Sequence, residues 1–304
     1  MINIAFFGTH DFAVEILQGL IDDPNINIEV VITQADKPVG RKKIITPPPI
    51  KILAQKYNLK IKQPESLKDF ILEISNLDLN IVCQYGKIIP PHILNYPEYK
   101  TLNVHTSLLP KYRGASPIQS AILNGEDKTG ITIMLMDDEL DHGPILAQIE
   151  VRIDKDDNYS TLSIKMAKKG KILLLNTIPA WINGEIKPQT QDENQKTLCY
   201  QITKEDGQIN WNNFAKQIYN QYRAYYVWPG IWTIWQNKRI KFLNIVLSDI
   251  ILSPGQIKVE DKKIFIGTKN ESIEVTKLQI EGKKPMTAPE FLNGYPDFKN
   301  SILK

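Results

Sequence analysis

Short apolar runs alternate with amphipathic segments over the first half of the chain. Ile2 to Phe7 is apolar, and Phe12 to Leu20 then carries apolar residues at helical spacing. Further apolar runs lie at Ile26 to Thr33 and Leu79 to Gln84, with a helical segment from about Pro49 to Lys56 between them. Strands and helices alternating in this way predict an open α/β sheet of the Rossmann-like, doubly wound kind.

Weaker patterns predict the remaining elements of this region. Leu59 to Gln63 is weakly strand-like, and Ser66 to Asp69 matches a helix-capping pattern in front of Phe70 to Ser75. Ile131 to Met136 and Ile145 to Ile153 are strand-like and flank an acidic turn. These two runs therefore predict a hairpin.

The second half of the chain has a different pattern. A long amphipathic segment from Tyr159 to about Ile182 predicts a helix, and the polar stretch Asn183 to Thr203 predicts an exposed connection. A short helix is expected from Asn212 to Tyr222. Short β-type runs then predict a small barrel: Ile231 to Trp235, Ile240 to Leu247, Gln256 to Val259, Lys263 to Gly267 and Ile273 to Leu278. We expect a first domain at 1–184, a linker at 185–205 and a second domain at 206–304.

Composition narrows the class of protein. The 304 residues are 42% hydrophobic and 23% charged, as in ordinary globular proteins. The first apolar run is too short for a signal peptide or a membrane span, so a cytoplasmic protein without membrane contact is expected. Two cysteines and four scattered histidines show no metal spacing, so no metal is expected. A single glycine in the first turn, Gly8, counts against a dinucleotide-binding oxidoreductase.

Positive charge is concentrated in two places. Residues 206–304 carry 14 Lys and Arg against 9 Asp and Glu, whereas residues 1–205 carry 23 against 25. Lys37, Arg41, Lys42 and Lys43 lie in a segment whose Pro38 and Gly40 argue against helix or strand. Both features suit a polyanion such as RNA, although solvated surface is the common explanation for such charge.

The stretch Leu102 to Pro110 carries the candidate chemistry. Side chains alternate along a strand, so Asn103 and His105 would share one face with Cα atoms roughly 6.6 Å apart. Asp141, in the acidic turn, can orient an imidazole or accept a proton. Two donors and a carboxylate suit direct transfer of an acyl group to an amine. Taken alone, an Asn-x-His pattern is more often a strand-end amide and a core histidine.

The residues around this pattern favour the catalytic interpretation over the structural one. Asn103-Val-His105 is followed by Ser107-Leu-Leu-Pro110, by Arg113-Gly114 and by Leu140-Asp141-x-Gly143. This arrangement resembles the folate-dependent formyltransferases, and along nearly its whole length the chain is similar to the branch that acts on methionine esterified to initiator tRNA. Asn103, His105 and Asp141 match the catalytic set of the family. Pro285 departs from the family pattern, because a basic residue is common there.

The resemblance implies a donor, an acceptor and further site residues. The expected co-substrate is 10-formyltetrahydrofolate, and the second domain is expected to be an OB-like barrel that binds tRNA. The implied folate-binding residues are Gln84, Tyr85, Gly86, Ile88, Ser107, Leu108, Leu109, Pro110 and Asp137. Gln84 to Ile88 would also fit a plain turn between a strand and a helix.

The basic loop is the implied site for the acceptor end of initiator tRNA. Arg41 is expected to make the discriminating contact, with Lys37, Lys42 and Lys43 as further binding residues. A monomer is expected. Two alternatives remain: a formyltransferase acting on a nucleotide-linked amino sugar with the same folate donor, which would have no use for this loop, and a non-enzymatic RNA-binding module.

Overall fold

The computed structural model describes residues 1–40 and 42–303. The chain folds into two compact units. The first comprises Met1–Pro117, Lys128–Arg152 and Leu162–Tyr200, and the second comprises Ile118–Asp127, Ile153–Thr161 and the chain from Gln201 onward. The second unit thus includes two short segments from within residues 1–184, and residues 185–200 lie in the first unit.

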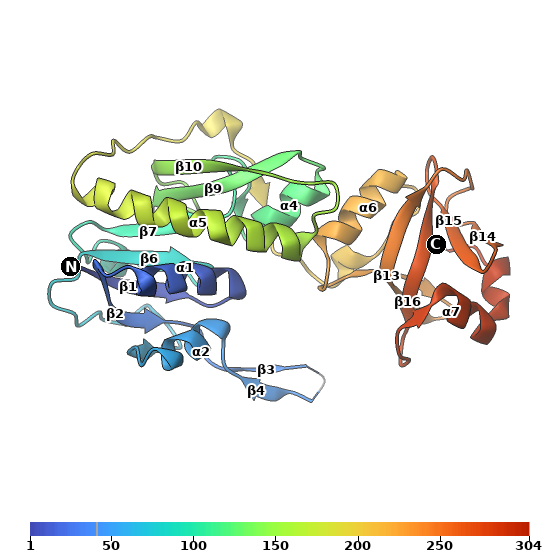
Figure 1. Cartoon of the computed structure of the whole chain (residues 1–304), viewed down its shortest axis with the longest axis horizontal. Helices are drawn as coiled ribbons and strands as arrows, with labels where there is room; N and C mark the ends of the chain where they lie inside the picture. Colours follow the sequence, from blue (N-terminus) through green and yellow to red (C-terminus); the bar gives the residue numbers. More distant parts are fainter. Residues whose placement is uncertain (41, 304) are drawn as a thin grey trace. The chain divides into compact units, whose positions relative to one another are not determined.

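The first unit is built on a seven-stranded sheet in the order β10-β9-β7-β6-β1-β2-β5 (Figure 1). Pairs among β5, β2, β1, β6 and β7 are parallel, and β9 and β10 are added antiparallel at the β7 edge. The strands are β1 (Ile2–Gly8), β2 (Ile26–Ile32), β5 (Ile61–Lys62), β6 (Leu79–Cys83), β7 (Thr101–His105), β9 (Lys128–Leu135) and β10 (Ile145–Arg152). The predicted open α/β sheet and the predicted hairpin are confirmed.

Helices connect these strands where the sequence predicts them. α1 (Asp11–Asp22), α2 (Pro49–Lys56) and α5 (Tyr159–Ile182) follow the periodic segments closely, and α4 (Pro117–Leu123) lies between β8 and β9 in the chain. A Cβ placed on Gly170 of α5 would lie within 3.6 Å of Ile16 of α1 and of Ile131 of β9, so these two helices pack together on one face of the sheet. The central strands β6 and β7 are buried at every position, as expected for parallel strands that are covered on both faces.

The predicted helix Phe70 to Ser75 is absent, and this prediction was wrong. The segment follows an irregular path in which Leu67 and Leu72 are buried against a cluster containing Phe7 and Ile32. The Ser66 hydroxyl accepts the backbone N–H of Lys68, which makes a local turn in place of a helix cap. Burial of leucines on the sheet therefore outweighs a weak local preference for a six-residue helix.

The basic segment also differs from its prediction. It forms a hairpin, hereafter the basic hairpin, in which β3 (Lys37–Val39) pairs antiparallel with β4 (Ile44–Thr46). Pro38 is tolerated because an isolated two-stranded ladder leaves one side of each strand unpaired. Gly40, with φ +70°, enters the turn, and its carbonyl accepts the N–H of Lys43.

The second unit contains an antiparallel sheet in the order β12-β13-β16-β15-β14, with β17 paired to β16. Its elements are α6 (Ala215–Ala224), β12 (Ile231–Trp235), β13 (Lys238–Ser248), β14 (Ile257–Glu260), β15 (Lys263–Gly267), β16 (Ser272–Ile280), β17 (Met286–Thr287) and α7 (Ala288–Gly294). The fold class, an α/β domain followed by a small β domain, is confirmed. α7 was not predicted.

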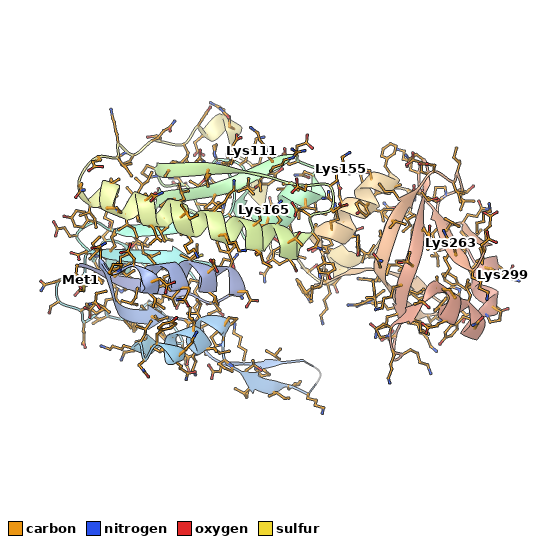
Figure 2. The ribbon with its side chains drawn as sticks, viewed as in Figure 1. Met1, Lys111, Lys155, Lys165, Lys263 and Lys299 are labelled. Carbon is orange, nitrogen blue, oxygen red and sulfur yellow. The ribbon has the colours of Figure 1, made fainter. Side chains whose placement is uncertain are left out.

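Side chains of the second unit follow the expected division between core and surface. Trp232 and Trp235 are buried, whereas Trp228 is 52% exposed. Exposed lysines such as Lys263 and Lys299 contribute the positive charge of this unit (Figure 2). Within residues 1–40 and 42–303, no helix combines the length and apolar character needed to cross a membrane.

Candidate active site

The three predicted catalytic side chains lie together in the first unit. β7 carries Asn103 and His105 on the same face, and they are 8% and 6% exposed. The turn after β9 returns Asp141 to the end of β7, because β9 pairs antiparallel with β7. Asp141 Oδ1 lies 3.4 Å from Asn103 Nδ2, and Asp141 Oδ2 lies 3.6 Å from His105 Nδ1. An amide, an imidazole and a carboxylate therefore converge.

The His105 ring is anchored by the backbone. Its Nε2 lies 3.0 Å from the carbonyl oxygen of Tyr112, which can only accept a hydrogen bond, so Nε2 carries a proton. Nδ1 is then the ring nitrogen that faces Asp141. The expectation that Asp141 holds the imidazole needs refinement: the Tyr112 carbonyl fixes the ring, and Asp141 stands beside it at the distance of a charge contact.

The Asp141 carboxylate is held in turn by a backbone N–H. Gly114 N donates to Asp141 Oδ2 at 2.8 Å. Gly114 has φ +121°, and a Cβ there would lie 2.1 Å from the carbonyl oxygen of Cys199. This close approach arises because β11 (Leu198–Cys199) pairs with β8 (Arg113–Gly114). Only glycine fits this position without displacing the strand behind Asp141.

The segment predicted to be an exposed connection is partly buried against this site. Gln191 is 6% exposed, and its Nε2 donates to the carbonyl oxygens of Asp141 at 2.9 Å and Gly143 at 2.8 Å. Arg113, 2% exposed, donates from Nε and Nη2 to Gln191 Oε1. No periodicity or motif marks Gln191 in the sequence, so its place at the site was missed.

Glu193 completes this network at the surface. Its Oε1 lies 2.6 Å from Arg113 Nη2, and its Oε2 lies 3.0 Å from Lys196 Nζ. The hydrogen bond from Arg113, assisted by Lys196, lowers the pKa of Glu193 to about 2. Glu193 therefore stays charged, and keeps neutralising the buried guanidinium, well below neutral pH.

The predicted folate-binding turn after β6 has its own supports. Gln84 has φ +46°, and the carbonyl oxygen of Tyr85 accepts from Thr9 Oγ1 and from Gln34 Nε2. The Tyr85 ring is buried, and burial raises the pKa of its hydroxyl to about 12. Gly86 and Ile88 are exposed, Ile88 to 93%. The turn is thus fixed at Tyr85 by Thr9 and Gln34, whereas Gly86 and Ile88 are open to solvent.

The other predicted folate residues follow β7 or the β9 end. Ser107 is fully buried and donates to the carbonyl of Lys111, while Leu109 is buried and its N–H donates to Thr132 Oγ1. Leu108 and Pro110 are half-buried. Asp137 lies beside the catalytic turn, with Oδ2 2.7 Å from His142 Nδ1. Ser107 and Leu109 support the backbone, which leaves Leu108, Pro110 and Asp137 accessible.

The described lysines of the basic hairpin, Lys37, Lys42 and Lys43, are all exposed. Lys37 also places Nζ 2.6 Å from Gln34 Oε1, and Gln34 in turn donates to the Tyr85 carbonyl. Arg41 lies outside the described residues.

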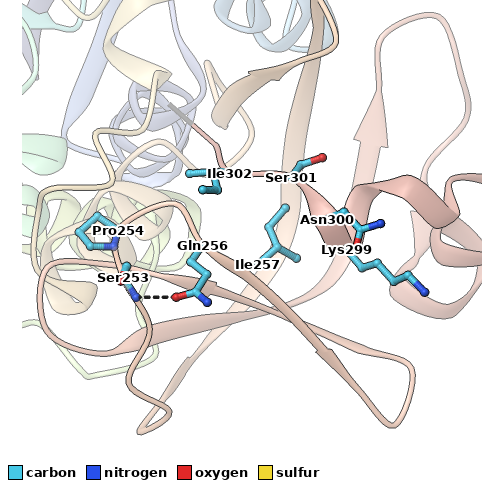
Figure 3. Close-up of a pocket in the computed structure, with 8 residues that line it drawn as sticks. All are labelled: Ser253, Pro254, Gln256, Ile257, Lys299, Asn300, Ser301 and Ile302. Atoms are coloured by element: carbon cyan, nitrogen blue, oxygen red, sulfur yellow. Dashed lines mark hydrogen bonds between the residues drawn. The ribbon is translucent and has the colours of Figure 1, made fainter.

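Other candidate sites are weaker. A hollow of about 410 Å³ in the second unit contains none of the predicted site residues (Figure 3). It is lined by Ser253, Pro254, Gln256, Ile257, Lys299, Asn300, Ser301 and Ile302. Among the residues that the structure describes, no group of three or more His, Cys, Asp or Glu side chains is arranged to hold a metal ion.

Comparison with known proteins identifies the family. A family model described as formyl transferase matches residues 2–178, and one described as formyl transferase, C-terminal domain, matches residues 201–296. The methionyl-tRNA formyltransferase of Caldicellulosiruptor saccharolyticus is 43% identical, with 99% of each chain covered. That of Halalkalibacterium halodurans is 42% identical, with 96% of this chain and 94% of the relative covered.

Solved structures share the fold at low identity. An N-formyltransferase from Helicobacter canadensis in complex with folinic acid and dTDP-3-aminofucose has a TM-score of 0.68 at 19% identity, covering 90% of this chain and 98% of that one. The methionyl-tRNA formyltransferase from Clostridium thermocellum has a TM-score of 0.55 at 18% identity, covering 90% and 99%. Together with the matches along the whole sequence, these findings show that the chain belongs to the formyltransferase family.

Proposed function

We propose that this enzyme transfers the formyl group of 10-formyltetrahydrofolate to the α-amino group of methionine esterified to initiator tRNA. The observation that carries the proposal is the 43% identity over 99% of both chains with a methionyl-tRNA formyltransferase. Its active site is the cluster of Asn103, His105 and Asp141. This activity fits a monomeric enzyme of the cytoplasm, which serves translation initiation.

The geometry of the cluster supports a direct transfer. The neutral amine attacks the formyl carbon, and the carbonyl oxygen becomes negative as the new C–N bond forms. Asn103 Nδ2 and the His105 ring donate hydrogen bonds to this oxyanion, with the ring held through Nε2 by the Tyr112 carbonyl. Asp141, whose Oδ2 lies 3.6 Å from His105 Nδ1, helps carry the amine proton away. The bond from the formyl carbon to the folate nitrogen then breaks, and that nitrogen takes up a proton.

We assign the two substrates to different residues of the first unit. Folate is proposed to contact the turn Gln84 to Ile88 together with Leu108, Pro110 and Asp137. The acceptor end of tRNA is proposed to contact Arg41, Lys42 and Lys43 of the basic hairpin, with Lys37 acting through Gln34. The charge of the second unit supports further contacts with the tRNA backbone.

A sugar-nucleotide acceptor is the second candidate, because the structural relative from Helicobacter canadensis was solved with dTDP-3-aminofucose. At 19% identity that likeness concerns the fold alone. The exposed lysines of the basic hairpin favour the tRNA acceptor, because tRNA presents many phosphates whereas a dTDP-linked sugar carries only two.

A competition between acceptors tests the proposal. Purified protein is supplied with formyl-labelled folate, methionyl-initiator tRNA and a dTDP-linked amino sugar. We expect the label on methionine, and tRNA affinity should fall steeply as salt is raised. Label on the sugar alone, or tRNA binding that ignores salt, would reject the tRNA acceptor.

A further inference from the structure

The turn that carries Asp141 is supported from outside the sheet. Asp141 has φ +48°, a conformation that residues with a side chain seldom adopt. Two carbonyl groups of this turn, those of Asp141 and Gly143, both accept from Gln191 Nε2. Gln191 lies 50 and 48 residues away from them in the sequence, beyond the end of α5. The turn is thus fixed by a distant segment as well as by its own hairpin.

The Gln191 amide is itself fixed in orientation. Its Oε1 accepts two hydrogen bonds, from Arg113 Nε at 3.1 Å and from Arg113 Nη2 at 2.8 Å. A guanidinium only donates, so the oxygen must face Arg113 and the NH2 group must face the turn. Arg113 adjoins Gly114, whose N–H holds the Asp141 carboxylate. Gln191 therefore holds the backbone of Asp141, and Gly114, the neighbour of Arg113, holds its side chain.

We propose that Gln191, oriented by Arg113, is a positioning residue for Asp141, so that the segment after α5 is part of the active site. The expected effect on kcat rests on the proposed function. The effect on the position of Asp141 depends only on the hydrogen bonds of Gln191 and Arg113. Without the two N–H groups of Gln191, the turn is free to leave its left-handed conformation. The Asp141 carboxylate then moves away from His105 Nδ1, now 3.6 Å distant.

The test compares two substitutions of the same chemistry. Gln191→Glu keeps an acceptor for Arg113 but removes both donors to the turn. Asn80→Asp is the matched control, because Asn80 is fully buried in the same unit and its Nδ2 also makes two hydrogen bonds, to the Ile93 carbonyl and to Thr101 Oγ1. Gln191→Met adds no charge and serves as a second variant should Gln191→Glu not fold. Thermal melts establish how much stability each variant loses.

The kinetic readout separates positioning from stability. We expect Gln191→Glu to lower kcat about 10- to 100-fold, the loss typical of a catalytic group misplaced by about 1 Å. KM for both substrates should stay within about threefold, since neither contacts Gln191 in this assignment. Asn80→Asp should keep kcat within about twofold even where it melts earlier. An equal fall of kcat in both variants, or a rise in KM alone, would overturn the inference.

A second readout needs no substrate. The ring ¹⁵N signals of His105, assigned by their loss in His105→Gln, report the carboxylate beside Nδ1. They should shift in Gln191→Glu and Gln191→Met and stay in place in Asn80→Asp at the same pH. Unchanged His105 signals in the Gln191 variants would disprove the placement. A wild-type protein that transfers no formyl group would refute the proposed function while leaving this spectroscopic result to decide the network.

Discussion

The catalytic cluster and the basic hairpin are built in opposite ways. Asn103 and His105 are almost wholly buried. His105 is held by the Tyr112 carbonyl, and Asp141 accepts hydrogen bonds from Gly114 and Gln191. The hairpin has only three paired positions on each strand, and its apolar side chains are exposed, Val39 to 57% and Ile45 to 63%.

This contrast fits the roles proposed for the two regions. Stabilising a charge that develops during reaction requires donors held in place before the substrate arrives. Attracting a polyanion requires positive charge within reach, and neither a fixed geometry nor burial. The first region should therefore respond to substitution in kcat, and the second in the affinity for tRNA.

Removing a proposed oxyanion donor is expected to have the largest effect. Asn103→Ala should lower kcat by about two to three decades, corresponding to about 3 to 4 kcal/mol, because the alanine cannot donate to the oxyanion. Equilibrium binding of methionyl-tRNA, measured on the same preparation, should stay within about twofold. If binding fell in parallel with turnover, Asn103 would belong to recognition.

The backbone behind Asp141 should be the next most sensitive point. Gly114→Ala places a Cβ against the Cys199 carbonyl, 2.1 Å away, and disturbs the N–H that holds Asp141. We expect kcat to fall at least about tenfold, as for a catalytic group moved by a fraction of an ångström. Gly184→Ala is the control, since φ there is +72° but nothing lies within 4 Å. It should cost about 1 kcal/mol in thermal melts and leave turnover intact.

Neutralising the hairpin should change affinity alone. The double substitution Lys42→Ala with Lys43→Ala should weaken tRNA binding about tenfold and reduce the slope of log K against log salt by about 2. The KM for folate should not change. Lys60→Ala with Lys168→Ala, both exposed and outside the hairpin, provides the charge-matched control. A control variant with the same reduced slope would show that tRNA senses only the overall charge.

The smallest expected effect concerns acid stability. The pKa of Glu193 is lowered from 4.5 to about 2, so its carboxylate stabilises the fold at neutral pH, and this contribution is lost as the pH falls through that range. Glu193→Gln should therefore have a slightly lower Tm than the wild type at pH 7. The two melting curves should converge as the pH approaches 2. A difference that persists there would mean that Glu193 acts through packing.

Elements with a strong local pattern could be predicted from the sequence. Pro49–Lys56 and Tyr159–Ile182 begin and end where periodicity places them. Phe70 to Ser75 failed because its neighbours are buried on the sheet, a constraint that no local pattern carries. The prediction that the basic segment forms no strand was wrong, because a chain that turns at Gly40 can still form a short ladder that includes Pro38.

The candidate site shows the same limit. Strand alternation was enough to place Asn103 and His105 on one face. The hairpin pattern predicted the turn that carries Asp141, but the position of this turn beside them depends on the pairing of β9 with β7. Gln191 could not be found in this way, since its partner Arg113 lies 78 residues earlier and its own neighbours are polar. Long-range hydrogen bonds between loops leave no periodic trace in a sequence.

The short β8–β11 ladder bears on how this enzyme can be divided. A fragment ending at Ile182, the last residue of α5, would retain the whole seven-stranded sheet and Asn103, His105 and Asp141. It would nevertheless lack the strand that crosses behind Gly114. Chimaeras that exchange carboxyl-terminal parts between relatives should therefore be joined after Tyr200, so that the turn carrying Asp141 and the segment containing Gln191 and β11 come from the same protein.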